Sequence, residues 1–463
     1  ADTHAAGGGL TDPLAVELLT AEGPRLLRRM LDQGARFERS SEGVLALSRE
    51  AGHSRRRVVR AGGDATGAEL ARLLAAVVAA TPSVRLVTDA EARALLVDHE
   101  GSIRGVLVRT VRGQRLHCLG RAVVLATGGI GGLYRYTTNP PESTGDGLAI
   151  AARAGAHLVD LEFVQFHPTA LDVGTHPMPL LTEALRGEGA KVVDETGQRF
   201  LSEASAELAP RDVLARAIWR HRGAGHEVLL DLRPIAALER RFPNVYRACR
   251  QHGIDPTTRP VPITPAAHYH MGGVAVDSRG RTSLPGLWAS GEVACTGVHG
   301  ANRLGSNSLL EALVFSSHLA RHLASELPPA TPSRPLTGRS PLAPAASQIV
   351  PRRGRRPRDE TVSQLRRLMW DRVGLVRHAR GLAQARDRLR ELAQAAGAGE
   401  RDPILVAGLI TAAAIARSES RGAHERADHP HQDEAWRRRL YVRLGPDDEP
   451  EIVAGPRLGD VAA

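Results

Sequence analysis

A short apolar strand that leads through a glycine-rich loop into a long helix constrains the fold of this chain most strongly. The strand is expected at residues 287–289, and the apolar helix is expected to begin at Ser308. Ser308 and Glu311 have the spacing of a capping box, in which two side chains bond free backbone N–H groups of the first turn. A helix that begins directly after such a loop presents unpaired N–H groups and a partial positive charge to a ligand. The stretch therefore predicts a ligand site in an α/β fold.

The basic charge of the chain does not indicate nucleic-acid binding. The 463 residues carry a formal net charge of +10, but Lys191 is the single lysine among 61 basic residues. This bias indicates arginine-rich coding, and aromatic residues, at 3%, are too few for base-stacking surfaces. No Schiff-base or phosphate-loop motif surrounds Lys191, which excludes enzymes that depend on such a lysine. The hydrophobic fraction of 42% is ample for buried cores, and no apolar run is long enough to predict a membrane span.

The cysteines and histidines do not predict a metal site. Cys118, Cys249 and Cys295 are far apart and form neither a disulfide framework nor a CxxC motif, so a reducing cytoplasm is the expected location. His268 and His270 would share one face of an extended strand, but no acidic or thiolate partner accompanies them. No bound metal is therefore expected.

A second buried strand is expected at residues 122–126, which run into Gly128 and Gly129. A continuously apolar strand of this kind fits a buried parallel sheet. Asp146, in the turn before a helix, is interpreted as either a helix N-cap or a cofactor contact. Alternating segments predict a β-meander before this strand, at residues 84–88, 94–98, 105–110 and 114–118. Apolar residues at helical spacing predict helices at residues 12–34, 64–78, 361–395 and 403–418.

The string HGANRLGSNSLLEAL, at residues 299–313, resembles the flavin-binding segment of the succinate dehydrogenase, fumarate reductase and L-aspartate oxidase flavoproteins. The strings ATGG, FHPT, TEALRGEG, LAPRD and AAHY extend the resemblance along the chain. It implies FAD as the cofactor and an α/β fold: a Rossmann-like FAD-binding domain that is incomplete at its N-terminus, an inserted α+β capping domain and a C-terminal helical domain. The implied boundaries are 1–160 and 268–326 for the two parts of the FAD-binding domain, 161–267 for the capping domain, 327–360 for a linker and 361–463 for the helical domain.

Each of these strings places residues that the resemblance assigns to the active site. The implied binders of a C4-dicarboxylate and carriers of a proton are His167, Thr182, Glu183, Arg211, His268 and Arg303. The implied contacts with FAD are Gly128, Gly129, Asp146, Glu292, Asn307, Ser308 and Leu309. Because the planar fork of arginine matches a carboxylate, Arg303 is expected to clamp one end of the substrate. Arg211, with Glu183 beside it, is expected to relay a proton.

Glu50 favours one branch of the resembled family. It lies in SREAGHS, which resembles the REGGHS string of the L-aspartate oxidases, with Ala51 where glycine is usual. That branch implies oxidation of L-aspartate to iminoaspartate with O2 or fumarate as acceptor, the first step of NAD biosynthesis through quinolinate. The implied partners are L-aspartate and fumarate, with a hand-off to quinolinate synthase and no nucleic acid or membrane. The alternatives are a fumarate reductase or succinate dehydrogenase flavoprotein subunit, or an inactive fragment that cannot hold FAD.

The first residues, ADTHAAGGGL, match a string that in the resembled family follows a βαβ opening with a GxGxxG turn. In that opening the pyrophosphate of the dinucleotide lies at the N-terminus of the first helix. The resemblance therefore implies a chain without this pyrophosphate site, and we expect it to bind FAD weakly.

Overall fold

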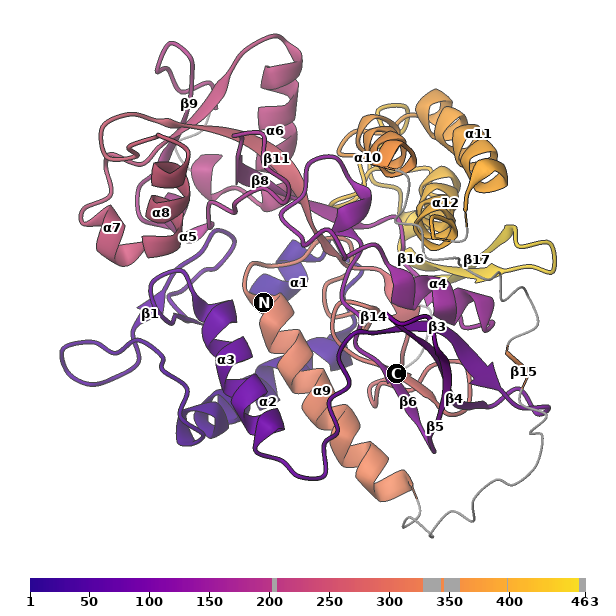
Figure 1. Cartoon of the computed structure of the whole chain (residues 1–463). Coiled ribbons are helices and arrows are strands. Elements are labelled where there is room, and N and C mark those ends of the chain that lie inside the picture. The colour runs from indigo at the N-terminus through magenta and orange to yellow at the C-terminus, as the bar shows by residue number, and fades with distance from the viewer. Residues whose placement is uncertain (202–205, 328–342, 345–358, 398, 458–463) are drawn as a thin grey trace.

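The computed structural model describes residues 1–201, 206–327, 343–344, 359–397 and 399–457. Figure 1 shows a lobe at the upper left, a group of helices at the upper right and a central body from which α9 descends. The chain leaves the central body after β7 (Leu158–Val159) to build the upper-left lobe and returns along β11 (Val261–His270). None of the helices described combines the length and the apolar character that a membrane crossing needs.

The central body contains the two strands that precede the glycine-rich stretches. β13 (Leu287–Ala289) pairs in parallel with β6 (Val123–Leu125), so the two strand ends lie side by side as a buried parallel sheet requires. A meander of β3 (Ala90–Val97), β4 (Ile103–Thr110) and β5 (Arg115–Leu119) precedes β6 in the chain. The strand predicted at residues 84–88 is wrong: these residues form no strand, and Leu86 and Val87 are exposed. The alternation of apolar and polar residues could not show that this segment has no neighbouring strand with which to pair.

A second sheet of the central body brings distant parts of the chain together. Its order is β14–β12–β7–β16–β17, in which β12 pairs in parallel with β14 and the other neighbours are antiparallel. The remaining bounds are Gly273–Ala275 for β12, Ala294–Cys295 for β14, Arg438–Leu444 for β16 and Pro450–Arg457 for β17. The last described part of the chain is therefore a β-hairpin that extends this sheet, whereas the sequence predicted a helical region there.

The upper-left lobe is an antiparallel sheet in the order β8–β11–β10–β9 with helices packed around it. Every residue of β8 (Val164–Leu171) is buried, and apolar residues of the sheet and of α6 (Arg211–Gly223) and α8 (Pro243–Gln251) share one core. The other elements are α5 (Ala184–Gly187), α7 (Leu238–Arg241), β9 (Lys191–Asp194), β10 (Val228–Asp231) and a 3-10 turn at Ala206–Leu208. Because β8 and β11 run from the central body into the lobe, side chains on them can lie between the two.

Two long helices support the loop that follows β13. The predicted N-terminal helix is confirmed as α2 (Pro13–Asp32), capped by Asp12, and it packs beside α9 (Asn307–Glu326). Gly23 allows this approach, because a Cβ there would lie 3.2 Å from the side chain of Leu310. The bounds of the other elements that precede β7 are Asp2–Ala6 for α1, Leu47–Ser48 for β1, Val58–Val59 for β2, Thr66–Ala79 for α3, Gly131–Leu133 for a 3-10 turn and Asp146–Arg153 for α4.

The three helices at the upper right of Figure 1 are α10 (Asp359–Val373), α11 (Ala379–Ala395) and α12 (Arg401–Ala416). The single helical region predicted over residues 361–395 is divided between Val373 and Ala379. Gly374 lies tightly against the last turn of α10, where a Cβ would meet the carbonyl oxygen of Trp370 at 2.3 Å, and His378 caps α11 by accepting from the N–H of Gly381. The predicted linker at 327–360 lies mostly outside the described residues, which in this range are Leu327, β15 (Ala343–Pro344) and the first two residues of α10.

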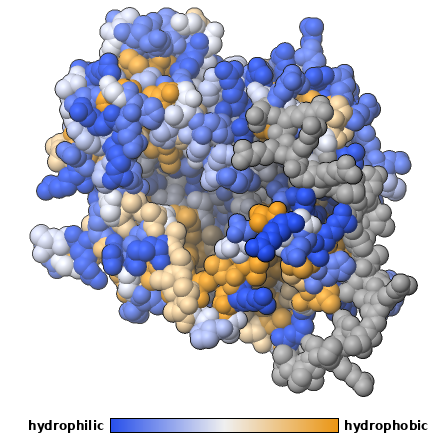
Figure 2. Space-filling view, in the orientation of Figure 1, coloured by the Kyte–Doolittle hydropathy of each residue, from blue (hydrophilic) through white to orange (hydrophobic). Residues whose placement is uncertain are grey.

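The hydropathy of the face seen in Figure 2 differs between the upper-left lobe and the lower middle. Hydrophilic residues predominate on the upper-left lobe, whereas apolar residues gather in the lower middle, where the segment after α3 passes α9. The exposed apolar side chains of α3 and of this segment include Val77, Val84, Leu86 and Val87. The domain boundaries given above remain a prediction.

Candidate active site

The loop between β13 and α9 places Arg303 between the central body and the lobe. Ser306 precedes α9 with a positive φ of 64°, so the chain enters the helix abruptly at Asn307. The predicted capping box is wrong: no side chain caps α9, and Ser308 Oγ instead accepts a hydrogen bond of 3.0 Å from Arg303 Nη1. Because the helix begins before Ser308, neither Ser308 nor Glu311 has the position that a capping box requires.

Arg303 and two histidines from the lobe sheet form the centre of the candidate site. The rings of His167 on β8 and His268 on β11 are 5.1 Å apart, and Arg303 raises the electrostatic cost of protonating either one. Burial first, and then the charge of Arg211, lowers the pKa of both histidines well below the usual value. Both rings are therefore neutral at physiological pH, and the local positive charge comes from arginine.

Two buried donors in this centre have no partner among the described residues. His167 Nδ1 accepts from the backbone N–H of Thr169 at 3.2 Å, so the proton of the neutral ring is on Nε2, which makes no hydrogen bond. Arg303 Nε is likewise buried and unpaired. Burial lowers the pKa of Arg303 to about 10, with a smaller effect from Arg211, and the guanidinium remains charged. Unpaired buried donors are costly, so this geometry suits an anionic ligand with acceptor oxygens.

A buried ion-pair chain lies next to these donors. Arg211, at the start of α6, donates through Nε and Nη2 to Glu183 Oε2 at 2.9 and 2.8 Å, and Arg186 donates to Glu183 Oε1 at 3.0 Å. Burial alone would raise the pKa of Glu183, but the two arginines lower it below the usual value. Glu183 is therefore an anion between two cations, as a proton-relay partner for Arg211 requires. Thr182 begins the same turn, where its Oγ1 accepts from the N–H of Ala184 at 3.4 Å.

Glu50 reaches the same place from the N-terminal part of the chain. Its Oε2 accepts a hydrogen bond of 2.9 Å from Ser306 Oγ. A Cβ on Gly305 would lie 2.5 Å from Glu183 Oε2 and 2.7 Å from Glu50 Oε2, so both carboxylates converge on this glycine. Burial, and then the negative charge of Glu183, raises the pKa of Glu50. Two facing carboxylates of this kind attract a cationic group.

The arginines that follow Glu50 in sequence have other partners. Arg56 pairs with Glu188, and Arg57 pairs with Asp2. Arg56 and Arg57 are therefore engaged away from Glu50, although they lie close to it in sequence.

The predicted cofactor residues gather around the ends of β6 and β13. A Cβ on Gly129 would lie 2.1 Å from Glu292 Oε1, so only glycine fits there, and Gly128 has a positive φ of 76°. Glu292 accepts from the N–H of His270 at 2.9 Å, and burial raises the pKa of Glu292 to about 7.

These residues fit a flavin. Ser290 Oγ, directly after β13, is buried without a partner among the described residues. The uncapped start of α9 presents the N–H groups of Ser308 and Leu309, whereas the N–H of Asn307 donates to the carbonyl oxygen of Leu304 at 3.4 Å. Hydrogen-bond donors and a helix N-terminus suit the electron-rich end of a reduced flavin. Asp146 is not the N-cap of α4, which is Gly145; it accepts from Thr144 Oγ1 at 3.0 Å.

Gln165 was not predicted from the sequence, although it connects the loop of Arg303 to the ion pair of Arg211 and Glu183. Its Nε2 donates to Asn302 Oδ1 and to the carbonyl oxygen of Arg303, both at 2.8 Å, while its Oε1 accepts from Arg211 Nη1 at 3.0 Å. The alternation of a strand places Gln165 on the same face of β8 as His167, two residues away. That spacing in VQFHPT was a signal that could have identified it.

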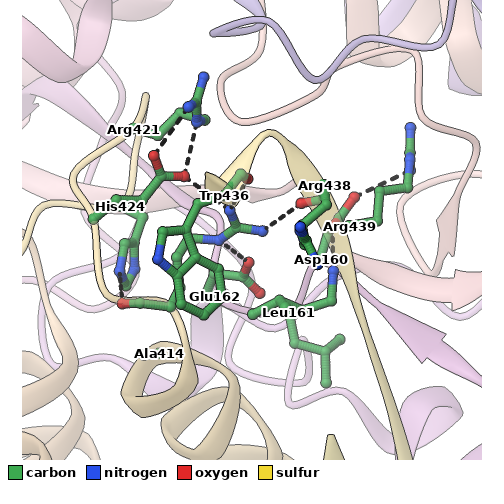
Figure 3. Close-up of polar contacts among 12 residues, drawn as sticks. Asp160, Leu161, Glu162, Ala414, Arg421, His424, Trp436, Arg438 and Arg439 are labelled. Atoms are coloured by element: carbon green, nitrogen blue, oxygen red, sulfur yellow. Dashed lines mark hydrogen bonds and ion pairs between the residues drawn. The ribbon is translucent and has the colours of Figure 1, made fainter. Parts of the chain in front are cut away.

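A buried charge network fixes the loops around the site to the C-terminal part of the chain (Figure 3). Arg417, which follows α12, donates to Glu162 at 2.6 Å and to Glu419 at 2.9 Å, and all three side chains are 0% exposed. Arg421 also pairs with Glu419 and donates to the carbonyl oxygen of Gly8 at 2.7 Å. Figure 3 shows Asp160 and Arg439 as a second pair beside this group, joined at 3.0 Å.

The rings of His268 and His270 make hydrogen bonds to different parts of the fold. His268 Nδ1 bonds Thr138 Oγ1 at 2.8 Å, whereas His270 Nε2 bonds the carbonyl oxygen of Leu161 at 3.0 Å. Across the described ranges, no group of three or more histidine, cysteine and acidic side chains is arranged to hold a metal ion.

Comparisons with known proteins match both the central body and the C-terminal region. The family model described as "FAD binding domain" matches residues 1–309, and that described as "Fumarate reductase flavoprotein C-term" matches residues 397–456. L-aspartate oxidase of Streptomyces coelicolor is 47% identical over 96% of this chain and 81% of the relative. L-aspartate oxidase of Caulobacter vibrioides is also 47% identical, over 94% of this chain and 82% of the relative. A solved structure of E. coli quinol fumarate reductase FrdA has a TM-score of 0.87 at 28% identity, over 98% of this chain and 86% of that chain. The predicted fold class is confirmed.

Proposed function

Because the chain belongs to the L-aspartate oxidase family of FAD-dependent flavoproteins, we propose that it oxidises L-aspartate to iminoaspartate at the site around Arg303. The observation that carries this proposal is that unpaired hydrogen-bond donors and buried carboxylates lie together in one site. Unpaired donors on Arg303 and His167 suit a carboxylate, and the carboxylates of Glu50 and Glu183 face the same glycine and suit an ammonium. Aspartate presents both kinds of charge within one small molecule.

Arg303, His167 and His268 bind the substrate carboxylates in this proposal. The buried guanidinium forms a charge-assisted pair, and the neutral histidines donate hydrogen bonds without adding a competing charge. Thr182 lies at the start of the turn that carries Glu183 and is the remaining hydroxyl assigned to the substrate. Water is excluded because His167, Arg303 and Glu183 are each at most 3% exposed.

Oxidation of aspartate removes a hydride from Cα and a proton from the nitrogen, which leaves a C=N bond. Bound FAD supplies the hydride acceptor, and O2 or fumarate then takes up the electrons. Gly128, Gly129, Glu292 and the start of α9 are the residues that would hold FAD. In the fumarate half-reaction, Arg211 gives a proton to the substrate carbon and regains it through Glu183 and Arg186. Arginine loses a proton only transiently because its pKa is very high, so the adjacent carboxylate is essential to this role.

Purified protein with excess FAD is expected to produce hydrogen peroxide and ammonia from L-aspartate in air, since iminoaspartate hydrolyses to release ammonia. D-aspartate and succinate are the matched controls. Peroxide and ammonia from neither enantiomer, in a preparation that contains bound FAD, would contradict the proposal.

Glu50→Gln is expected to separate aspartate oxidation from fumarate reduction. The change preserves the shape of the side chain but removes the negative charge that we assign to the substrate ammonium. Loss of one side of a charge-assisted hydrogen bond costs about 1.5–3 kcal/mol, which is roughly a tenfold to a hundredfold decrease in kcat/KM for aspartate. Fumarate has no ammonium, so its reduction is expected to stay near the wild-type rate. Measurement of both reactions on one preparation tests this expectation.

Glu42→Gln is the matched control, because Glu42 is exposed on a loop of the same N-terminal segment. It is expected to change neither reaction. If Glu50→Gln lowers both activities equally, Glu50 supports the structure of the site and does not select aspartate, and a fumarate reductase becomes the better assignment.

The pH dependence of aspartate oxidation is expected to follow Glu50. Only the ionised carboxylate attracts the ammonium, and the raised pKa of Glu50 means that this form is lost at a higher pH than for an ordinary glutamate. As the pH falls through that raised pKa, kcat/KM for aspartate should decrease more steeply than kcat/KM for fumarate. The ratio of the two values, measured across a pH series, should become flat in Glu50→Gln. A ratio that keeps the same acidic limb in the variant would assign the titration to another group.

The product suggests where the enzyme acts and what receives iminoaspartate. Iminoaspartate reacts readily with water, so we propose direct transfer to quinolinate synthase in the cytoplasm. The three cysteines are free thiols in the structure, which suits a reducing compartment. Addition of quinolinate synthase should lower the ammonia released per peroxide formed, whereas a heat-inactivated synthase should not.

A further inference from the structure

The ring of Tyr269 lies against the guanidinium of Arg303. Arg303 Cζ is 4.6 Å from the centroid of the tyrosine ring, and the two residues are 3% and 7% exposed. A cation over an aromatic face is attracted by the ring quadrupole, and the attraction is strongest where water is excluded. The ring therefore supports the guanidinium of Arg303, whose Nη1 is fixed to Ser308 and whose Nε has no partner among the described residues.

Glu311 on α9 fixes the position of this ring. The Tyr269 hydroxyl donates to Glu311 Oε2 at 2.6 Å, and the carboxylate is only 1% exposed. Glu311 is itself held on both oxygens, because Thr296 Oγ1 donates to Oε1 at 2.6 Å and His299 Nε2 lies 2.9 Å from Oε2. Burial alone would raise the pKa of Glu311, but the nearby histidine and these hydrogen bonds lower it. The carboxylate is therefore a fixed anionic acceptor for the phenol.

The contacts of Tyr269 with Arg303 and Glu311 join three separate elements of the site. Tyr269 comes from β11 directly after His268, Glu311 comes from the second turn of α9, and Arg303 comes from the loop between β13 and α9. His299, in the same loop, packs edge-on against the Tyr269 ring at 5.2 Å and approaches its hydroxyl at 3.3 Å. The loop that carries Arg303 thus contacts Tyr269 a second time, through His299.

We propose that Tyr269 and Glu311 are positioning residues for Arg303: the carboxylate holds the phenol, and the face of the phenol ring holds the guanidinium in the orientation that binds a substrate carboxylate. This inference rests on the assignment of Arg303 to the substrate made above. It adds two residues that act through Arg303 and do not touch the substrate. It also gives Glu311, which the sequence interpreted as a helix cap, a role in the affinity for dicarboxylates.

The test measures the affinity for succinate, the dicarboxylate formed by fumarate reduction, from the change in flavin absorbance of the FAD-containing protein. Tyr269→Leu removes the ring face and is expected to weaken succinate binding about 3- to 30-fold. Tyr269→Phe keeps the aromatic face but loses the hydrogen bond to Glu311, so it should weaken succinate binding about 2- to 10-fold. Its affinity for succinate should therefore lie between those of the wild type and of Tyr269→Leu. Glu311→Gln should weaken succinate binding as much as Tyr269→Phe does. The double variant should bind succinate no more weakly than either single variant, because both changes break the same hydrogen bond.

Two controls distinguish a positioning role from general support of the fold. Tyr134→Phe alters another buried tyrosine, whose hydroxyl has no partner among the described residues, and it should leave succinate affinity unchanged. The thermal midpoint of each variant and its affinity for FAD are measured in parallel and should change much less than the succinate affinity. A proportional loss of all three quantities in Tyr269→Phe and Glu311→Gln would overturn the proposal.

Arg303→Leu separates failure of this inference from failure of the proposed function. If Arg303→Leu abolishes succinate binding while Tyr269→Phe, Tyr269→Leu and Glu311→Gln bind as the wild type does, the positioning role is wrong and the substrate site stands. If Arg303→Leu also binds succinate normally, the substrate site itself is wrong. Where Tyr269→Leu does not fold, the comparison of Tyr269→Phe with Glu311→Gln and their double variant decides the question.

Discussion

Arg303→Leu is expected to lower kcat/KM for both aspartate and fumarate by about two to three orders of magnitude. The guanidinium is 3% exposed and has an unpaired Nε, so a bound carboxylate would be buried against it. Removal of one member of a buried charge pair costs about 3–5 kcal/mol, because the other charge is left without compensation. Both substrates carry the carboxylate that Arg303 is assigned to bind, so both reactions should fall together. Steady-state kinetics on the two substrates measures this directly.

Arg25→Leu provides the control for this change. Arg25 is 74% exposed and pairs with Glu22 on the surface of α2, an interaction worth about 0–1 kcal/mol. It should leave both reactions within about threefold of the wild type. Equal losses in Arg25→Leu and Arg303→Leu would show that the effect comes from general destabilisation, and the substrate role of Arg303 would then be withdrawn.

Arg211→Leu is expected to decrease kcat for fumarate reduction by about 100- to 10,000-fold, the range for loss of a positioned general acid. Arg211 holds Glu183 through two hydrogen bonds, and leucine can neither give a proton to the substrate nor receive one from that carboxylate. The KM for fumarate should change less than kcat, since Arg303 and the two histidines keep the carboxylate contacts. Glu183→Gln, which keeps the shape of the relay but removes its charge, should also lower kcat.

Arg220→Leu lies on the same helix and controls for the loss of an arginine from α6. Its side chain is 60% exposed and pairs with Glu425. We expect wild-type kcat in this variant. A normal kcat in Arg211→Leu, or a loss that appears in KM alone, would mean that Arg211 binds the substrate and that the proton comes from elsewhere.

The sequence predicted the residues of the site better than the contacts among them. HGANR, FHPT, TEALRGEG and LAPRD each contain a chemically specific residue, and the structure brings Arg303, His167, Glu183 and Arg211 together from these four segments. Gln165 was missed because an amide does not suggest chemistry until its neighbours are known. Glu311 was interpreted as a cap because the spacing of a capping box is local, whereas the real start of α9 depends on the backbone of Ser306, which turns into the left-handed region.

The fold shows the same limit of local patterns. Residues 84–88 alternate as a strand does, yet they have no neighbouring strand with which to pair. Residues 438–444 do form β16, with Leu440 and Val442 buried, although the run of arginines around them hides the alternation. Pairing with β7 and β17 determines that residues 438–444 form a strand, and β7 lies hundreds of residues before β16 in the chain. Periodicity describes one segment and carries no information about its distant partner.

The charge network of Arg417, Glu419 and Arg421 also determines when the site becomes complete during synthesis. Arg421 bonds Gly8 across most of the chain, and Gly422 fits against Ala301 so closely that a Cβ would lie 2.5 Å from its carbonyl oxygen. Ribosomes add about 5–20 residues each second, so the loop with Arg303 emerges roughly 6–24 s before the segment that closes over it. Throughout that interval Glu162 is a carboxylate without its arginine. The nascent chain therefore depends on solvent or on chaperones to satisfy this buried charge until Arg417 arrives.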